Sequence, residues 1–189
     1  MSSNLQIITG DVTNIEDVKS VLQYQSQQAP IIFSGIGMRF NDKHGVDKEI
    51  CQKGTKVILS AVDSIYHDIK PFCVFVSTIG TGLGDRDIPL VYIPLYHTLL
   101  KIPLTDKAGM ERLIRDAVAD GRISGFCMPR PTLFATGEAR GVLKIRAGID
   151  DKQEIGYTIS REDVGRWMYE ELVVGDRTKW TNKSPSLTY

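Results

Sequence analysis

The chain has 189 residues, enough for one domain with a hydrophobic core of its own. Hydrophobic residues make up 42% of the chain and charged residues 24%, which is ordinary for a globular protein. Basic and acidic residues number 23 each, so no overall charge favours nucleic acid, an anionic membrane or an acidic ligand. Any partner must therefore be recognised by a local site.

The three cysteines and three histidines are too scattered for a disulfide framework or a metal site. The cysteines are typical of buried, reduced thiols, so we expect a cytoplasmic protein without a bound metal. The N-terminus lacks the pattern of a secretory signal, and no apolar run reaches the ~18 residues that would span a bilayer. We expect neither nucleic acid nor a membrane as a partner, and the oligomeric state stays open.

Apolar runs alternate with amphipathic patterns through the first two thirds of the chain. The runs predict strands over residues 5–9, 30–34, 72–77 and 125–128. Helical patterns begin after a capping-box pattern at Thr13, near Val46, and at Lys107. Continuous apolar strands that alternate with helices predict a parallel sheet covered on both faces, and hence a doubly wound α/β domain.

The remaining segments are less regular. Residues 78–103 are rich in Gly, Pro and aromatics and are expected to lie over the sheet edge as part of a pocket. Residues 135–156 are expected to be a loop layer with a small strand, followed by a strand at 156–159 and a helix capped by Ser160. The domain is thus predicted over residues 1–174, with a polar tail at 175–189 that frays.

Lys107 is the residue whose interpretation matters most. It lies beside the apolar stripe of its helix, which includes Met110, Leu113 and Ile114. It can be a lysine that runs along an apolar surface and keeps its charge in water. It can also be a cation above the end of the sheet, placed to bind a ribose or a reacting carbonyl oxygen. Right-handed crossovers bring the carboxyl ends of the strands to one edge, where ligands bind in such sheets. The residues expected at that edge are Asp11, residues 34–37, Ser77, Thr78, Pro131 and Thr132.

Six motifs in order resemble the short-chain dehydrogenase/reductase superfamily, and most closely its atypical, NmrA-like branch of NAD(P)-binding Rossmann proteins. The motifs are Gly10-Asp11-Val12-Thr13, Ser34-Gly35-Ile36-Gly37, Val76-Ser77-Thr78, Asp106-Lys107-Ala108-Gly109-Met110-Glu111, Arg130-Pro131-Thr132-Leu133 and Ile159-Ser160-Arg161-Glu162-Asp163-Val164. They cover nearly the whole chain. The resemblance implies a Rossmann-like domain with NAD or NADP as its cofactor.

By this resemblance, one group of residues would hold the adenosine half of the cofactor. Asp11 and Val12 would hold the adenine, with the Asp11 carboxylate accepting a hydrogen bond from the amino group of the ring. Ser34, Gly35 and Gly37 would let the backbone pass close to the riboses. Without the resemblance, Asp11 would be interpreted as a turn or cap residue and the others as ordinary turn residues.

A second group would lie at the nicotinamide. Ser77 and Thr78 would stand beside the ring, where a hydroxyl can bond a substrate carbonyl. Lys107 would bond the nicotinamide ribose and stabilise a developing alkoxide through its charge. Pro131 and Thr132 would meet the carboxamide. Lys107 and Ser77 are therefore the predicted catalytic residues.

Two features depart from the family pattern. The tyrosine of the Tyr-x-x-x-Lys pair is missing, because Pro103 stands four residues before Lys107. Tyr92, Tyr96 and His97 could supply a proton instead, or could be packing residues.

The second departure is the glycine-rich turn that binds the pyrophosphate at a helix N-terminus. The run Gly80–Gly84 does not match GxGxxG and no helix is predicted after it. We therefore expect an N-terminally truncated Rossmann domain with partial adenine and nicotinamide contacts and no pyrophosphate contacts. Met1 would then be an internal methionine of a longer product or the start of a truncated gene model.

Three functions follow from these observations. The first is an NAD(P)-dependent oxidoreductase that transfers hydride to a small carbonyl or conjugated, apolar substrate. The second is a non-catalytic, NmrA-like module that senses a dinucleotide and contacts a protein partner. The third is an inactive, truncated relative. The choice between NAD and NADP is not made by these residues.

Overall fold

Three parallel strands form the centre of the structure, a computed structural model that describes residues 5–24, 27–39, 46–81, 87–150 and 152–189. The strands are β3 (Ile31–Ser34), β4 (Phe72–Phe75) and β5 (Gly125–Cys127), in the order β3-β4-β5. Ile32 lies opposite Cys73, which in turn lies opposite Phe126. The predicted parallel sheet is confirmed.

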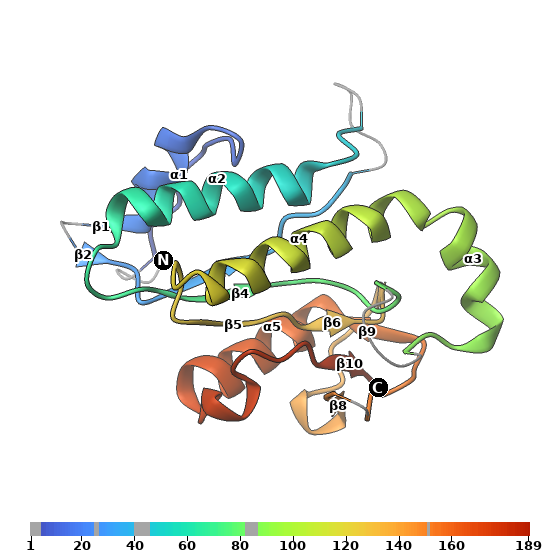
Figure 1. Cartoon of the computed structure of the whole chain (residues 1–189). Helices are drawn as coiled ribbons and strands as arrows, with labels where there is room; N and C mark the ends of the chain where they lie inside the picture. The colour runs from blue at the N-terminus through green and yellow to red at the C-terminus, as the bar shows by residue number, and fades with distance from the viewer. Residues whose placement is uncertain (1–4, 25–26, 40–45, 82–86, 151) are drawn as a thin grey trace.

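Helices cover both faces of this sheet (Figure 1). One face carries α1 (Ile15–Leu22), α2 (Ile50–Ile65) and α4 (Lys101–Ala119), and the other carries α5 (Arg161–Tyr169) with the π-helical turn Glu170–Val174. The prediction of a doubly wound α/β domain is therefore confirmed. None of the helices among the described residues is long and apolar enough to cross a membrane.

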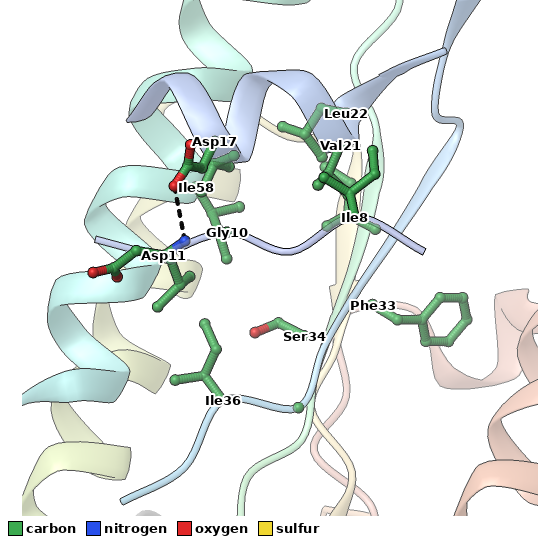
Figure 2. Close-up of a pocket in the computed structure, with 14 residues that line it drawn as sticks. Ile8, Gly10, Asp11, Asp17, Val21, Leu22, Phe33, Ser34, Ile36 and Ile58 are labelled. Atoms are coloured by element: carbon green, nitrogen blue, oxygen red, sulfur yellow. Dashed lines mark hydrogen bonds between the residues drawn. The ribbon is translucent and has the colours of Figure 1, made fainter. Parts of the chain in front are cut away.

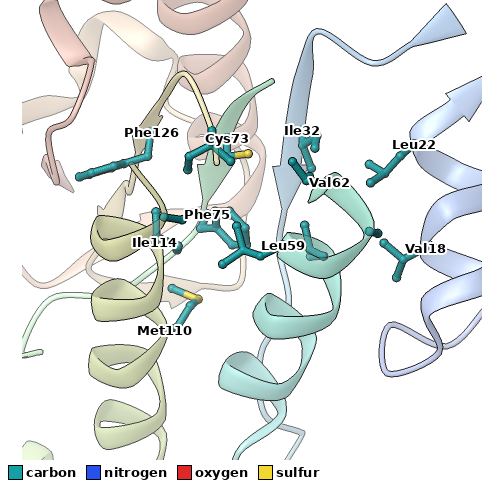
Figure 3. Packing of buried hydrophobic residues seen from close by; sticks show 14 of the residues in the cluster. Val18, Leu22, Ile32, Leu59, Val62, Cys73, Phe75, Met110, Ile114 and Phe126 are labelled. Carbon is teal, nitrogen blue, oxygen red and sulfur yellow. The ribbon is translucent and has the colours of Figure 1, made fainter. Parts of the chain in front are cut away.

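The hydrophobic core is divided by the sheet into two clusters. Cys73 and Phe75 of β4 belong to the cluster under α2 and α4, whereas Phe72 and Val74 belong to the cluster on the α5 face. This is the alternation that a strand buried on both faces requires. Figure 3 shows strand side chains packed towards Leu59 and its neighbours on α2 and α4.

Side chains that accept backbone N–H groups define where the helices begin. Asn14, rather than the predicted Thr13, caps α1 by accepting from the N–H of Glu16 at 3.0 Å. Ser160 caps α5 as predicted, accepting from the N–H of Asp163 at 3.0 Å.

The start of α2 is capped from another helix. Asp106 of α4 is 1% exposed, and its carboxylate accepts from the N–H groups of Cys51 and Gln52 at 2.9 and 3.0 Å. Because a helix N-terminus presents free N–H groups and partial positive charge, this carboxylate fixes α4 against α2. The residue that precedes Lys107 therefore helps to place the Lys107 helix.

The prediction of a strand at residues 5–9 is wrong. No described residue of this segment is in a strand, and Leu5 and Ile7 are 69% and 82% exposed. A strand needs a hydrogen-bonded neighbour, and among the described residues β3 is paired only with β4. The segment therefore does not join the sheet, and of its apolar residues Ile8 lines the pocket beside β3.

The loop expected over residues 78–103 is partly helical. A 3₁₀ turn (Leu90–Tyr92) and α3 (Ile93–Thr98) precede α4, which begins at Lys101. Pro103 is accommodated in the first turn of α4, where an N–H group would have no helical partner in any case. Lys107 consequently lies in the second turn of its helix, not at its opening.

The C-terminal segment does not fray as predicted. After a 3₁₀ turn (Arg177–Trp180), β10 (Ser186–Thr188) lies between β6 (Arg130–Pro131) and β8 (Arg146–Gly148), parallel to the first and antiparallel to the second. The other short elements are β1 (Gln23–Tyr24) with β2 (Gln27–Gln28), β7 (Leu133–Ala135) with β9 (Thr158–Ser160), and the 3₁₀ turn Val142–Lys144. The segment is held by pairing with strands more than 30 residues away in the sequence, which its polar composition does not reveal.

This docking predicts that Leu187→Ala lowers the free energy of unfolding by about 2–5 kcal/mol, as expected for a buried leucine. Leu187 is 0% exposed, whereas Leu143 is 100% exposed and provides a matched control. Urea denaturation should find Leu143→Ala within about 0.5 kcal/mol of the parent chain. Equal, small effects for both substitutions would show that the C-terminal strand does not belong to the folded unit.

Candidate functional site

A pocket of about 270 Å³ lies beside the carboxyl end of β3. Four of the predicted adenosine-side residues line it, namely Asp11, Val12, Ser34 and Gly35, whereas Gly37 is not among its lining residues. Figure 2 shows the segment around Gly10 and Asp11 passing opposite Ser34. The structure thus brings together residues more than 20 positions apart in the sequence.

Asp11 is held in a turn at the edge of this pocket. Its N–H donates to Asp17 Oδ2 at 2.8 Å, and its own Oδ1 accepts from the N–H and the hydroxyl of Thr13, both at 2.8 Å. The hydrogen bonds from the backbone and side chain of Thr13 lower the pKa of Asp11. The carboxylate is therefore an anionic acceptor whose Oδ2 is available among the described residues.

The walls of the pocket are largely apolar. They include Val21 and Leu22 of α1, Ile58 of α2, and Ile36. In Figure 2 the Ser34 side chain points towards the pocket, while the neighbouring Phe33 points away from it. An apolar slot with a hydroxyl inside and a carboxylate at its edge can accommodate a flat heterocycle that carries an amino group.

Lys107 connects this pocket to the next strand. Its Nζ donates to the carbonyl oxygens of Ile36 at 2.6 Å and Val76 at 2.5 Å, so it bridges the carboxyl ends of β3 and β4. Burial lowers the pKa of Lys107. The amine is therefore turned inward, and it does not hold its charge in bulk water as a surface lysine would.

Ser77 follows this bridge directly. It is 3% exposed, and its hydroxyl donates to Glu111 Oε1 at 2.6 Å. A serine hydroxyl has one proton, so in this arrangement Ser77 can accept from a ligand but cannot also donate to a substrate carbonyl. The hydrogen bond that we predicted from Ser77 to a substrate requires the hydroxyl to leave Glu111.

Glu111 and Arg130 form a buried ion pair beneath Ser77. Arg130 Nε and Nη2 donate to the two carboxylate oxygens of Glu111 at 2.9 and 2.6 Å, and the two side chains are 4% and 0% exposed. We assigned neither residue a role from the sequence. The available signal was an acid on the apolar face of the Lys107 helix, since a carboxylate in a buried stripe needs a partner.

The other nicotinamide-side residues gather at the same strand ends. Thr78 and Pro131 are adjacent, because the N–H of Ile79 donates to the Pro131 carbonyl at 3.4 Å and the Thr78 hydroxyl lies 3.5 Å from it. Thr132 is 2% exposed and its hydroxyl lies 3.3 Å from that of Thr188 in β10. Thr132 is thus turned into the core beside its predicted neighbours.

The aromatic residues considered as proton donors form a packed group. Tyr96 is 2% exposed and stacks on Tyr92, with ring centroids 6.5 Å apart. Tyr92 also makes an edge contact with Tyr157 at 5.5 Å. The His97 side chain and the glycine run at residues 82–84 lie outside the described part of the chain.

Known proteins resemble the whole of this chain. A family model described as NAD(P)H-binding matches residues 1–173. A reductase of Aspergillus terreus, pytE, is 35% identical over 208 residues, which cover 100% of this chain and 79% of the relative. An oxidase of Aspergillus niger, pynE, is 30% identical over 226 residues, which cover 100% of this chain and 80% of that relative.

Solved structures agree on the fold. A short-chain dehydrogenase/reductase from Veillonella parvula, solved in complex with NADP, aligns with a TM-score of 0.69 and 15% identity over 96% of this chain and 71% of that one. The oxidoreductase ylbE from Lactococcus lactis aligns with a TM-score of 0.59 and 19% identity over 98% of this chain and 72% of that one. At these identities the likeness shows the Rossmann-like fold alone.

Proposed function

The chain belongs to the NAD(P)H-binding family, and from this premise we propose that it is a reductase of small carbonyl or conjugated, apolar substrates. The observation that carries the proposal is the position of the Lys107 amine. It joins Ile36 at the pocket to Val76 beside Ser77, which places a cation between the two predicted halves of a dinucleotide site.

The residues of the pocket fit the adenosine half of the cofactor. Apolar walls suit the adenine ring, and the Asp11 carboxylate at the edge suits its amino group. Among the described residues, and apart from the adjoining backbone, no heavy atom lies within 4 Å of the Cβ that a side chain would add at Gly35 or Gly37, so a ribose can approach the backbone there. In this proposal Asp11, Val12, Ser34, Gly35 and Gly37 hold the adenosine.

The nicotinamide half would lie at the ends of β4 and β6. Thr78, Pro131 and Thr132 would border the ring, and Ser77 would accept a hydrogen bond from the cofactor or the substrate. Lys107 would hold the ribose and stabilise negative charge that develops on a substrate oxygen. When bound, NADP or NAD supplies the hydride.

The curated relatives support a small-molecule substrate. One is described as a reductase and the other as an oxidase, and the chain covers 79% and 80% of their lengths. Both descriptions are those of enzymes that act by electron or hydride transfer.

One observation favours a second function, a dinucleotide-sensing module without turnover. Pro103 occupies the position four residues before Lys107, where classical short-chain dehydrogenases have the tyrosine that serves as the acid. The proton of the Ser77 hydroxyl is directed to Glu111. If no other group protonates the product alkoxide, cofactor binding would occur without reduction.

Binding and turnover can be tested separately. Titration with NADPH and with NADH, followed by nicotinamide fluorescence, is expected to give saturable binding of at least one of them. Asp11→Ala is expected to weaken that binding about tenfold, the effect of about 1.4 kcal/mol. Thr13→Val is the matched control, because it loosens the same turn and keeps the carboxylate.

The substrate assay then separates the two functions. Oxidation of the bound cofactor by small aldehydes, ketones or quinones supports the reductase, and binding without oxidation supports the sensing module. Absence of a fluorescence change at millimolar NADPH and NADH would contradict both.

A further inference from the structure

A second cavity of about 430 Å³ lies against the face of α4 that carries Leu104, Ala108 and Arg112. Its walls come from α4, from α3, from the turn after β4, and from Gln52 of α2. It shares no lining residue with the pocket at β3, and neither Lys107 nor Ser77 borders it. Its volume is within the range of small-molecule sites.

The described residues that line this cavity include two cations and no acid. The cations are Lys101 and Arg112, both on α4. They are 11 positions apart, which places them on one face of the helix, three turns and roughly 16 Å apart along its axis. Among the described residues neither cation forms a salt bridge. The cavity therefore has a basic side chain near each end, while the carboxylate of Asp87 lies behind its wall and accepts a hydrogen bond from the N–H of Gly80.

The neutral residues between the cations combine apolar surface with hydrogen-bonding groups. Ile88 and Leu104 contribute apolar surface, and Tyr96 contributes its ring. The hydroxyl of Tyr96 is buried and has no hydrogen-bond partner among the described residues. Because this oxygen has almost no accessible surface, it faces away from the open space of the cavity, and the tyrosine contributes only its ring to the wall.

Two glycines allow the walls to approach one another. Gly80 has a φ of +82°, and a Cβ there would lie 2.7 Å from Tyr96 Cδ1. A Cβ at Gly109 would lie 2.3 Å from the Gln52 side chain, whose Nε2 also contacts Asp106 Oδ1 at 3.3 Å. A larger residue at Gly80 would therefore displace the Tyr96 ring, whereas the flexible end of the Gln52 side chain can move to make room at Gly109.

We propose that this cavity is a binding site for a small organic acid, a carboxylate on an apolar body. The carboxylate pairs with Arg112 or Lys101, and the apolar body packs against Ile88, Leu104 and the Tyr96 ring. The proposal is independent of the cofactor site, because it uses none of the residues of that site.

Calorimetric titration of the cofactor-free chain with benzoate tests this proposal. Benzoate is expected to bind more tightly than benzyl alcohol, its neutral counterpart. The double variant K101Q/R112Q is expected to weaken benzoate binding at least about tenfold, as loss of a charge-assisted contact should. Lys56→Gln removes an exposed charge from α2 outside the cavity and should leave the affinity unchanged.

The single variants Lys101→Gln and Arg112→Gln then identify which end of the cavity binds the carboxylate. The proposal is overturned if benzoate does not saturate the chain below roughly 10 mM, a concentration far above the dissociation constant expected for a specific site of this kind. It is equally overturned if the double variant binds benzoate as the parent does, or if benzyl alcohol binds as tightly as benzoate.

Discussion

Replacing Glu111 by leucine is expected to lower the free energy of unfolding by about 3–5 kcal/mol, the cost of breaking a buried ion pair from one side. Glu111 is 0% exposed, and its two oxygens receive Arg130, the Ser77 hydroxyl and, at 3.5 Å, the Thr81 hydroxyl. The variant would leave the Arg130 guanidinium in the core without this carboxylate. Chemical denaturation monitored by tryptophan fluorescence measures the effect.

Two further variants separate the ion pair from the helix that carries it. Glu111→Leu combined with Arg130→Met is expected to recover part of the loss, since a pair of apolar residues avoids burying a guanidinium that has lost this carboxylate. Asp116→Ala on the same helix removes an exposed acid and should change stability by less than about 0.5 kcal/mol. A loss for Glu111→Leu as small as that for Asp116→Ala would mean that the ion pair contributes nothing to the fold.

The ion pair also bears on the chemistry of the site. As long as Glu111 accepts the hydrogen bond from the Ser77 hydroxyl, the orientation of that hydroxyl is fixed at the end of β4. In Glu111→Leu the Ser77 hydroxyl is free to rotate. A change of substrate preference in the fraction of this variant that still folds would show that the hydroxyl contacts the substrate. The same residue thus connects the stability of α4 to the geometry of the candidate site.

The elements that the sequence predicts well are those whose signal is local. The continuous apolar runs that became β3, β4 and β5, and the helical stripe around Met110 and Ile114, depend on residue type and spacing within a few turns. The topological rule then brings Ser34 and Ser77 to one edge of the sheet without knowledge of any distance, whereas Asp11 reaches the pocket from a segment that is not a strand.

The predictions that failed depended on partners distant in the sequence. Residues 5–9 have the composition of a strand but do not pair with the free edge of β3, whereas polar β10 is buried because β6 and β8 flank it. Periodicity does not report pairing. The Glu111–Arg130 contact was missed for the same reason, although a carboxylate in an apolar helical stripe indicated that some cation had to lie opposite.

Lys107→Met is expected to reduce reductase turnover by about 10²–10³-fold, the usual effect of removing one group that stabilises developing charge. Methionine keeps the length of the side chain and removes the ammonium. The carbonyl oxygens of Ile36 and Val76 lose their donor, so a destabilisation of about 1–3 kcal/mol should accompany the change. Turnover must therefore be normalised to the folded fraction.

A control must show that the loss comes from this amine and not from the charge of the domain. Lys56→Met removes an exposed lysine of α2 and is expected to leave turnover unchanged. If Lys107→Met binds NADPH and turns over like the parent once folding is taken into account, the lysine only clamps the two strand ends. In that case the sensing module would remain the better proposal.

The pH dependence distinguishes the proposed role from a structural one. Burial lowers the pKa of Lys107 from its ordinary value of 10.5, and the role that we propose needs the protonated amine. Activity should therefore be complete below this lowered pKa and be lost as the pH rises through it, earlier than for a free lysine. The neighbouring Cys51 does not titrate in the same range as this loss of activity when the loss occurs at lower pH, because burial raises the pKa of its thiol to about 11.

Lys107→Arg shifts this limb if the ammonium is the titrating group. A guanidinium stays protonated above pH 12, so any activity that this variant retains should persist to higher pH than that of the parent. An alkaline limb at the same pH in both proteins would assign the titration to another group and remove Lys107 from the reaction. Because a strand clamp needs only a hydrogen-bond donor, the shift of this limb is the result that a purely structural lysine would not produce.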